Sequence, residues 1–152
     1  MKHRGAQITL ILSMLGVSWL GMMVVHEFGH VVGAWTSGGI VRDVDLHPLR
    51  FSRTDVAPNP HPLWEVWAGP VVGVALPIAL WGALAWCGDP RAYLFRFFAG
   101  ACAVINGAYI GAGWLVEAGD AADLQALGTP VWAMAAFGVT CVGGGLWMWN
   151  GL

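Results

Sequence analysis

The sequence predicts an all-α polytopic membrane protein with about four transmembrane helices. Hydrophobic residues make up 57% of the 152-residue chain and charged residues only 11%, whereas a soluble domain carries about a quarter charged residues. Four apolar stretches are long enough to cross a hydrocarbon core of roughly 30 Å. Ten Trp residues are also present, several of them near the ends of these stretches, where bilayer and water meet.

Each apolar stretch is expected to form one membrane helix. The first is interpreted as a retained helix and not as a signal peptide, because its apolar run continues well past the length of a signal sequence. The predicted spans are Gln7 to Trp35, Leu63 to Cys87, Ala92 to Val116 and Thr129 to Trp149. The total length suits one bundle, so we expect a single membrane-embedded domain over residues 1–152.

The segment from Ser37 to Pro62, between the first two spans, has a different character. It mixes apolar and charged residues, and Val44, Asp45 and Leu46 alternate in the way typical of a half-buried strand. We therefore expect a short β-hairpin here, with an ordinary polar loop as the alternative. The connection between the third and fourth spans is acidic and rich in Ala.

The charge balance limits the partners of the chain. The net charge is −2 and no basic block is present, so nucleic acid is not an expected partner. The expected surroundings are the lipid bilayer. Three Cys residues lie in apolar segments without C-x-x-C spacing, and we interpret them as small buried hydrophobic residues.

The most informative motif is H-E-x-x-H, formed by residues 26–30 within the first apolar stretch. In a helix, His26 and His30 lie four residues apart on one face, so both imidazoles can reach one metal ion. Glu27 follows directly and can hold a water molecule at that metal. Ionisable groups at membrane depth are expensive and usually functional. The motif therefore predicts a zinc site, with Zn²⁺ as the expected cofactor.

A catalytic zinc ion usually takes three protein ligands and one water molecule, so a third ligand must come from another part of the chain. The candidates share a side chain that can bind a metal and a place in one of the connections. They are Asp120, Asp123, Glu117, His47 and His61. A carboxylate returning from a different helix could complete a tetrahedral site, and we rank Asp120 first among the candidates. Asp123 remains an alternative, and either Asp could instead be a helix N-cap.

The residue types predict hydrolysis by a zinc metallopeptidase. Zinc lowers the pKa of a water molecule towards neutrality and polarises the carbonyl group of the scissile bond. Glu27 is the expected catalytic residue, which takes the proton from that water and passes it to the leaving amine. The sequence therefore predicts zinc-dependent hydrolysis at or within a lipid bilayer.

Three elements of the chain resemble the site-2 protease family of intramembrane zinc metalloproteases, in its short, minimal form. The first is the motif at residues 26–30, and the second is Ala68-Gly69-Pro70 at the start of the next span. The third is residues 119–124, which are similar to the family's aspartate motif, although Ala121 stands where the family usually has Gly. Asn106 lies upstream of that motif, further away than in the family.

The resemblance implies a core of membrane helices that holds zinc within the bilayer and cleaves membrane-embedded peptide segments. It implies that His26, His30 and Asp120 bind the metal and that Glu27 is the catalytic acid and base. The expected partners are a membrane protein or peptide substrate and, for control of cleavage, a regulatory membrane partner. We expect a multi-pass protein in the cell membrane of a prokaryote.

Two other functions remain open at this point. One is a membrane-anchored protease of the same motif class whose third ligand is a glutamate, which here could only be Glu117. The other is a catalytically inactive membrane scaffold, with or without zinc. The presence of Glu27 argues against the scaffold, because a scaffold has no use for a general base.

Overall fold

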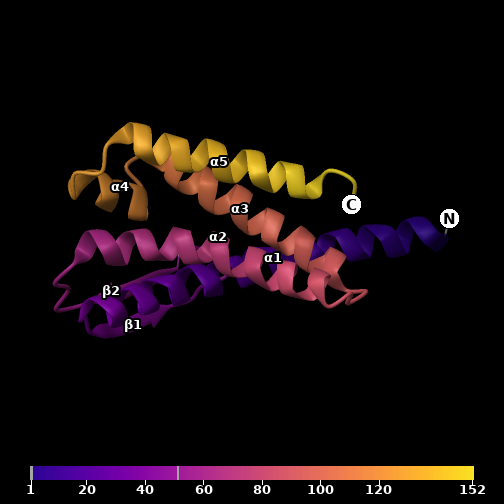
Figure 1. The fold of residues 1–152 in the computed structure, drawn as a ribbon, viewed down its shortest axis with the longest axis horizontal. Helices are drawn as coiled ribbons and strands as arrows, with labels where there is room; N and C mark the ends of the chain where they lie inside the picture. Colours follow the sequence, from indigo (N-terminus) through magenta and orange to yellow (C-terminus); the bar gives the residue numbers. More distant parts are fainter. Residues whose placement is uncertain (1, 51) are drawn as a thin grey trace.

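The computed structural model describes residues 2–50 and 52–152, so Met1 and Phe51, the latter within the predicted hairpin segment, lie outside the described residues. Helices dominate the fold, and one pair of strands lies between the first two helices (Figure 1). In chain order the elements are α1 (Lys2–Ser37), β1 (Val41–Asp45), β2 (Arg53–Val56), α2 (Pro62–Trp86), α3 (Ala92–Gly113), α4 (Gly119–Ala126) and α5 (Val131–Trp149).

Within the described residues, α1, α2, α3 and α5 are the four helices long and apolar enough to cross a membrane. The predicted all-α membrane fold is therefore confirmed, and the chain is a multi-pass membrane protein. Large apolar side chains on these helices are exposed, as Trp86 is at 92% and Val139 at 76%, which suits surfaces that contact lipid rather than water. The first helix starts at Lys2 and not at Gln7, and the third ends at Gly113 and not at Val116.

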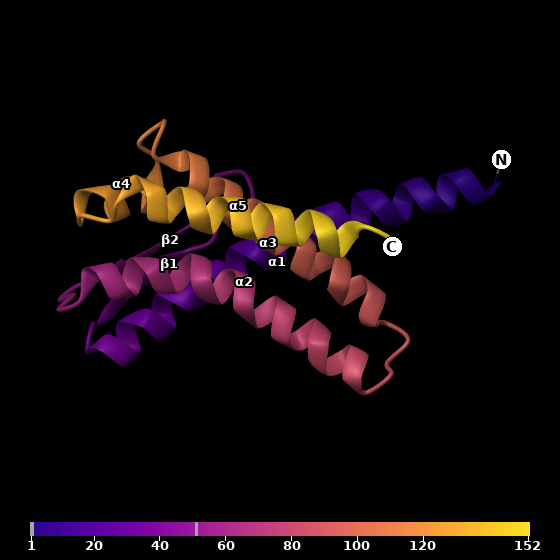
Figure 2. The same ribbon diagram turned by 45° about the horizontal axis from the view of Figure 1, so that its top comes forward.

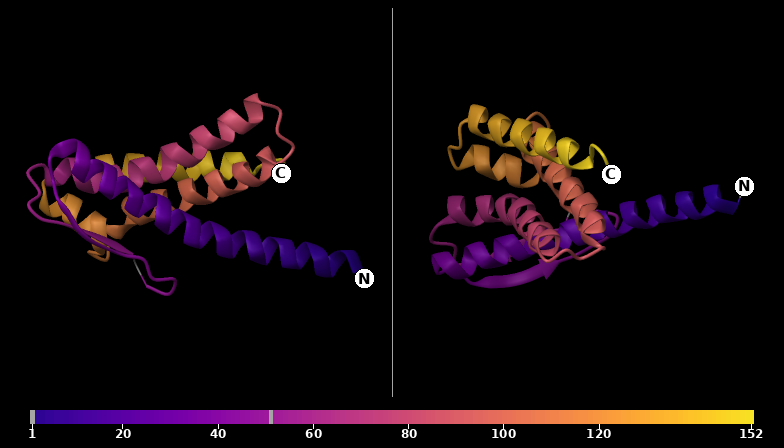
Figure 3. Two further views of the ribbon diagram at one scale, coloured as in Figure 1. Left: turned by 90° about the horizontal axis from the view of Figure 1, so that it is seen from below. Right: turned by 45° about the vertical axis from the view of Figure 1, so that its right-hand side comes forward.

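The four long helices alternate in direction, so the connections gather at two opposite ends. Both termini lie at one end of the molecule, and the strand pair and α4 lie at the other (Figure 1). Helix α1 packs mainly on α2, and α3 packs mainly on α5. The N-terminal part of α1 extends beyond the other helices in every view (Figures 2 and 3), as expected for 36 residues that span about 54 Å at 1.5 Å per residue.

Glycine residues allow the helices to approach closely. A Cβ atom on Gly138 of α5 would lie 2.6 Å from the Cα atom of Gly111 on α3, and one on Gly107 would lie 2.7 Å from the Cβ atom of Cys141. Small residues at such crossings let backbones pack tightly where lipid provides no hydrophobic driving force. The glycine residues therefore determine how closely α3 and α5 approach each other.

The segment between α1 and α2 contains the predicted hairpin and is not an ordinary polar loop. Strands β1 and β2 are antiparallel, with Val44 opposite Thr54 and an irregularity in the register between Val41 and Asp43. The hairpin folds back along α1, outside the helix bundle (Figure 3, left). At its tip, the Trp19 indole donates a hydrogen bond of 2.9 Å to the Pro48 carbonyl oxygen.

The acidic connection after α3 forms an additional short helix, α4, which the sequence analysis treats only as a connection. Ala121 and Leu124 are fully buried against Ile110 of α3 and Met134 of α5. This burial at helical spacing stabilises a segment of eight residues, which is too short to cross a membrane. Gly119 starts the helix at a φ of +47°, where a side chain is strained, and a Cβ atom there would overlap the Tyr109 hydroxyl group.

The α3–α5 crossing generates a stability prediction. We expect Gly138→Ala to lower the thermal unfolding temperature in detergent micelles, because overpacking against the backbone of Gly111 costs about 1–3 kcal/mol. The matched control is Gly144→Ala in the same helix, where a Cβ atom meets nothing within 4 Å. Equal unfolding temperatures for the two variants would contradict the packing described here.

Candidate metal centre

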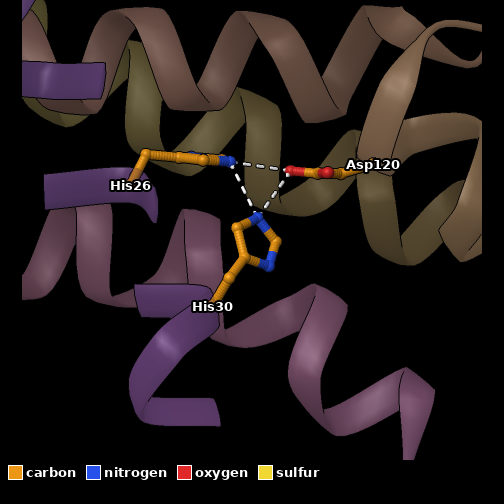
Figure 4. Close-up of side chains that lie close together, drawn as sticks. All are labelled: His26, His30 and Asp120. Atoms are coloured by element: carbon orange, nitrogen blue, oxygen red, sulfur yellow. Dashed lines mark hydrogen bonds and ion pairs between the residues drawn. The ribbon is translucent and has the colours of Figure 1, made fainter. Parts of the chain in front are cut away.

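Three side chains that can bind a metal converge where α1 faces the start of α4. The distances are 2.7 Å between His26 Nε2 and Asp120 Oδ2, 3.1 Å between the two Nε2 atoms and 3.2 Å between His30 Nε2 and Asp120 Oδ2 (Figure 4). Among residues 2–50 and 52–152, these three side chains form the one group of at least three possible metal ligands whose atoms lie within 4.8 Å of one another. The structure thus brings together three residues that the sequence analysis selects.

The cluster assembles because local and distant constraints coincide. His26 and His30 lie on consecutive turns of α1, and both are buried, with 6% and 5% of their surface exposed. Asp120 lies in the first turn of α4, and its backbone N–H donates a hydrogen bond of 2.9 Å to the Tyr109 hydroxyl oxygen of α3. Helix α3 therefore fixes the position from which Asp120 reaches the imidazoles.

Asn106 of α3 orients the His26 ring. The Asn106 amide nitrogen donates a hydrogen bond of 2.9 Å to the Cys102 carbonyl oxygen, so the amide oxygen faces His26 Nδ1 at 2.6 Å. That oxygen can only accept, so Nδ1 of His26 carries the proton in this contact. The Nε2 lone pair of the neutral ring then points towards Asp120.

Glu65 of α2 orients the His30 ring in the same way. His30 Nδ1 lies 2.8 Å from the carboxylate oxygen Oε1 of Glu65 and 3.1 Å from its carbonyl oxygen. Both atoms are acceptors, so Nδ1 of His30 also donates. Glu65 is 6% exposed, and the Asn59 side chain donates a hydrogen bond of 3.2 Å to its other carboxylate oxygen.

Glycine residues where α1 and α2 approach closely leave space for these contacts. A Cβ atom on Gly29 would lie 2.5 Å from the Ala68 carbonyl oxygen, and one on Gly69 would overlap the His30 ring. The absence of a side chain at Gly29 therefore lets the α2 backbone approach α1 closely. Gly69, the centre of the Ala68-Gly69-Pro70 element, provides the space in which the His30 imidazole lies.

Glu27 is buried beside the cluster, with 3% of its surface exposed. Its carboxylate oxygen Oε2 accepts a hydrogen bond of 2.7 Å from the Thr54 hydroxyl group of β2. Glu27 thus contacts the hairpin, whereas its neighbour His26 contacts α3 and α4.

Two cavities of different character meet at Glu27, Tyr109 and Asp120. The apolar cavity lies between α1 and α3, and its further lining includes Trp19, Met22, Met23 and Ile105. The polar cavity lies towards the hairpin and α4, and its further lining includes Arg53, Asp55, Glu65 and Asp123. One cavity is therefore lined mainly by polar and charged side chains, and the other offers an apolar surface.

The two aspartates of α4 have different electrostatic surroundings. Burial alone would raise the pKa of Asp120, but the hydrogen bonds that His26 and His30 donate when protonated at Nε2 outweigh burial and hold that pKa well below the ordinary value. Burial, together with the nearby charges of Asp120 and Glu65, raises the pKa of Asp123. Asp120 is therefore ionised near neutral pH, as a metal ligand must be.

The remaining candidate ligands lie outside the cluster. Asp123 is exposed and only lines the polar cavity, and Glu117 is exposed in the turn before α4. His47 lies near the hairpin tip, where its Nδ1 atom accepts a hydrogen bond of 3.2 Å from the Leu49 backbone. His61 precedes α2 and borders a groove formed with Trp64 and other residues.

Three residues that contact the site were not selected from the sequence: Glu65, Thr54 and Tyr109. Glu65 could have been found, because a carboxylate in the first turn of an apolar span is the same kind of signal that identified Glu27. Thr54 carries no comparable signal, since its contact depends on how the hairpin folds back on α1.

Comparison with protein-family models found no matching family, and comparisons with curated proteins and with solved structures found no match to this chain. The resemblance to the site-2 protease family remains a prediction from its motifs.

The role of Gly69 can be tested by zinc titration of the detergent-solubilised protein. We expect Gly69→Ala to weaken zinc binding by about 10- to 100-fold, because the methyl group displaces the His30 ring. Gly82→Ala, in the same helix with nothing within 4 Å of the added Cβ atom, serves as the control and should bind zinc as the unmodified protein does. Unchanged affinity in Gly69→Ala would show that His30 is not held as described.

Proposed function

We propose that this protein is an intramembrane zinc metalloendopeptidase of the site-2 protease type, located in the cell membrane of a prokaryote. Its metal ligands are His26, His30 and Asp120, and Glu27 is its general base. The proposal is supported by the spacing of the motif, by the burial of its ionisable residues in a membrane helix and by the convergence with Asp120.

One observation supports this function more strongly than the others. Both Nδ1 atoms face acceptors, so in the neutral rings both Nε2 atoms are acceptors as well. Two Nε2 lone pairs and a carboxylate oxygen then lie within 3.2 Å of one another. Acceptors repel one another unless a proton or a cation lies among them, and one divalent cation would satisfy all three.

The donor set fits zinc. Two imidazole nitrogens and one carboxylate oxygen leave one coordination position open, as in catalytic zinc sites. Ligand atoms of a tetrahedral zinc ion lie roughly 3.3 Å apart, and the three separations here are between 2.7 and 3.2 Å. The rings are also anchored through Nδ1 by Asn106 and Glu65, the outer contacts that zinc-binding histidines usually make.

In the proposed reaction, zinc when bound supplies a Lewis acid that polarises the peptide carbonyl and lowers the pKa of water. Glu27 accepts the proton from the attacking water and delivers it to the leaving amine. The polar cavity beside Glu27 provides a route for that water from the hairpin end of the bundle. His26 and His30 hold the metal through Nε2 and do not transfer protons in this scheme.

The proposed substrate is a membrane-embedded peptide segment. The apolar cavity between α1 and α3 supports this choice, because apolar side chains such as Met22, Met23 and Ile105 line it directly beside Glu27. A peptide from the lipid phase carries side chains that such a surface can accept. A regulatory membrane partner remains part of the proposal.

The identity of the third ligand separates this proposal from an enzyme that uses Glu117. We expect Asp120→Ala to lose stoichiometric zinc, as measured by elemental analysis after dialysis, because two histidines alone hold zinc weakly. Asp123→Ala and Glu117→Ala are matched controls from the same acidic segment and should keep one zinc per chain. Loss of zinc in Glu117→Ala with retention in Asp120→Ala would support the glutamate ligand instead.

A second variant separates the protease from an inactive scaffold. Glu27→Gln should keep its zinc and its thermal stability but cleave a single-span reporter peptide in phospholipid vesicles about 10²- to 10⁴-fold more slowly, the usual contribution of a general base. Equal cleavage by Glu27→Gln and the unmodified protein would remove Glu27 from the mechanism. Absence of cleavage by both, with zinc bound, would favour the scaffold.

A further inference from the structure

The Glu27 carboxylate contacts a part of the molecule that lies outside the helix bundle. Its Oε2 atom accepts a hydrogen bond from Thr54 in β2, whereas the rest of the site is built from helices. Among the described residues, no hydrogen bond reaches the other oxygen, Oε1. The hairpin therefore restrains one oxygen of the base, and the other makes no hydrogen bond with the described residues.

The orientation of Thr54 is set by the strand pairing. Thr54 lies opposite Val44, and its neighbours Arg53 and Asp55 lie opposite Asp45 and Asp43. Because side chains alternate along a strand, a slip of one residue would turn the Thr54 hydroxyl group to the other face of the sheet. A β-branched side chain also has a restricted χ1 angle, so the register of the hairpin determines where the hydroxyl group lies.

The hairpin itself is fixed to α1 at both ends. At its base, the Gly39 N–H donates a hydrogen bond of 2.8 Å to the Ala34 carbonyl oxygen at the end of α1. Near its tip, the Trp19 indole donates to the Pro48 carbonyl oxygen. These contacts lie on either side of Glu27 along α1, so β2 crosses α1 at the level of the base.

We propose that Thr54 is a positioning residue for Glu27, which makes the hairpin the element that orients the general base. This inference rests on the proposed function. Thr54 touches neither the metal ligands nor the reacting atoms. It holds Oε2 of Glu27, which leaves Oε1 as the oxygen that takes the proton from the water. Loss of the hydroxyl group leaves the carboxylate free to rotate, and misplaced catalytic groups lower rates strongly.

The test compares Thr54→Val, which keeps the shape but removes the hydroxyl group, with Thr54→Ser, which keeps the hydroxyl group. We expect Thr54→Val to lower kcat for a single-span reporter peptide by about 10- to 100-fold, with little change in KM or in zinc content. Thr54→Ser should recover most of the lost rate. The matched control is Thr9→Val in the N-terminal part of α1, whose hydroxyl group donates a hydrogen bond to the Gly5 carbonyl oxygen of its own helix.

A double-mutant cycle shows whether Thr54 acts through Glu27. In a Glu27→Gln background, Thr54→Val should change the residual rate by less than about twofold, because the group it positions is already lost. A full additional loss there, a loss of zinc in Thr54→Val, or an unchanged kcat in Thr54→Val would each overturn the proposal.

An infrared measurement tests the contact without substrate. The difference spectrum between the unmodified protein and Glu27→Gln isolates the carboxylate band of Glu27. That band should shift in Thr54→Val and return in Thr54→Ser, and an unshifted band in Thr54→Val would overturn the proposal. If the unmodified protein cleaves no peptide, the proposed function fails, and the infrared comparison still decides whether Thr54 holds the carboxylate.

Discussion

The site depends on one constraint, the mutual approach of acceptor atoms that repel one another. Two imidazoles on consecutive turns of α1 and a carboxylate from α4 lie within hydrogen-bond distance inside an apolar bundle. Such a group is tolerable only if positive charge lies among its members. The other contacts serve this arrangement: Asn106 and Glu65 turn the rings, and the Tyr109 hydroxyl group receives the backbone of Asp120.

The convergence of these side chains also explains the positions of several glycine residues in the bundle. Gly29 and Gly69 bring α1 and α2 together where the His30 ring must fit, and Gly119 allows α4 to start under the Tyr109 hydroxyl group. The α3–α5 pair, which packs through Gly107, Gly111 and Gly138, also packs against α4. Packing between small residues in lipid and the geometry of the site are thus two results of the same helix spacing.

Much of this architecture could be predicted from the sequence, because the decisive signals are local. Apolar length gives the spans, and the spacing of His26 and His30 places both rings on one face. The choice of Asp120 needed the resemblance to a family, since composition alone does not separate it from Asp123. Helix α4 depends on the burial of Leu124 against α3 and α5, and the Thr54 contact depends on hairpin register. Both are set by tertiary packing that no local pattern contains.

Asp120 lies in α4, ninety-four residues after His26, and therefore after three of the four long helices. During synthesis, the two imidazoles enter the membrane long before their anionic partner exists. In the proposed enzyme, a nascent chain therefore cannot assemble a complete zinc site until translation has passed the third long helix. Because this carboxylate is synthesised late, the proposed hydrolase would stay inactive in the insertion machinery. It would therefore not cleave the many unfolded membrane segments that are present there.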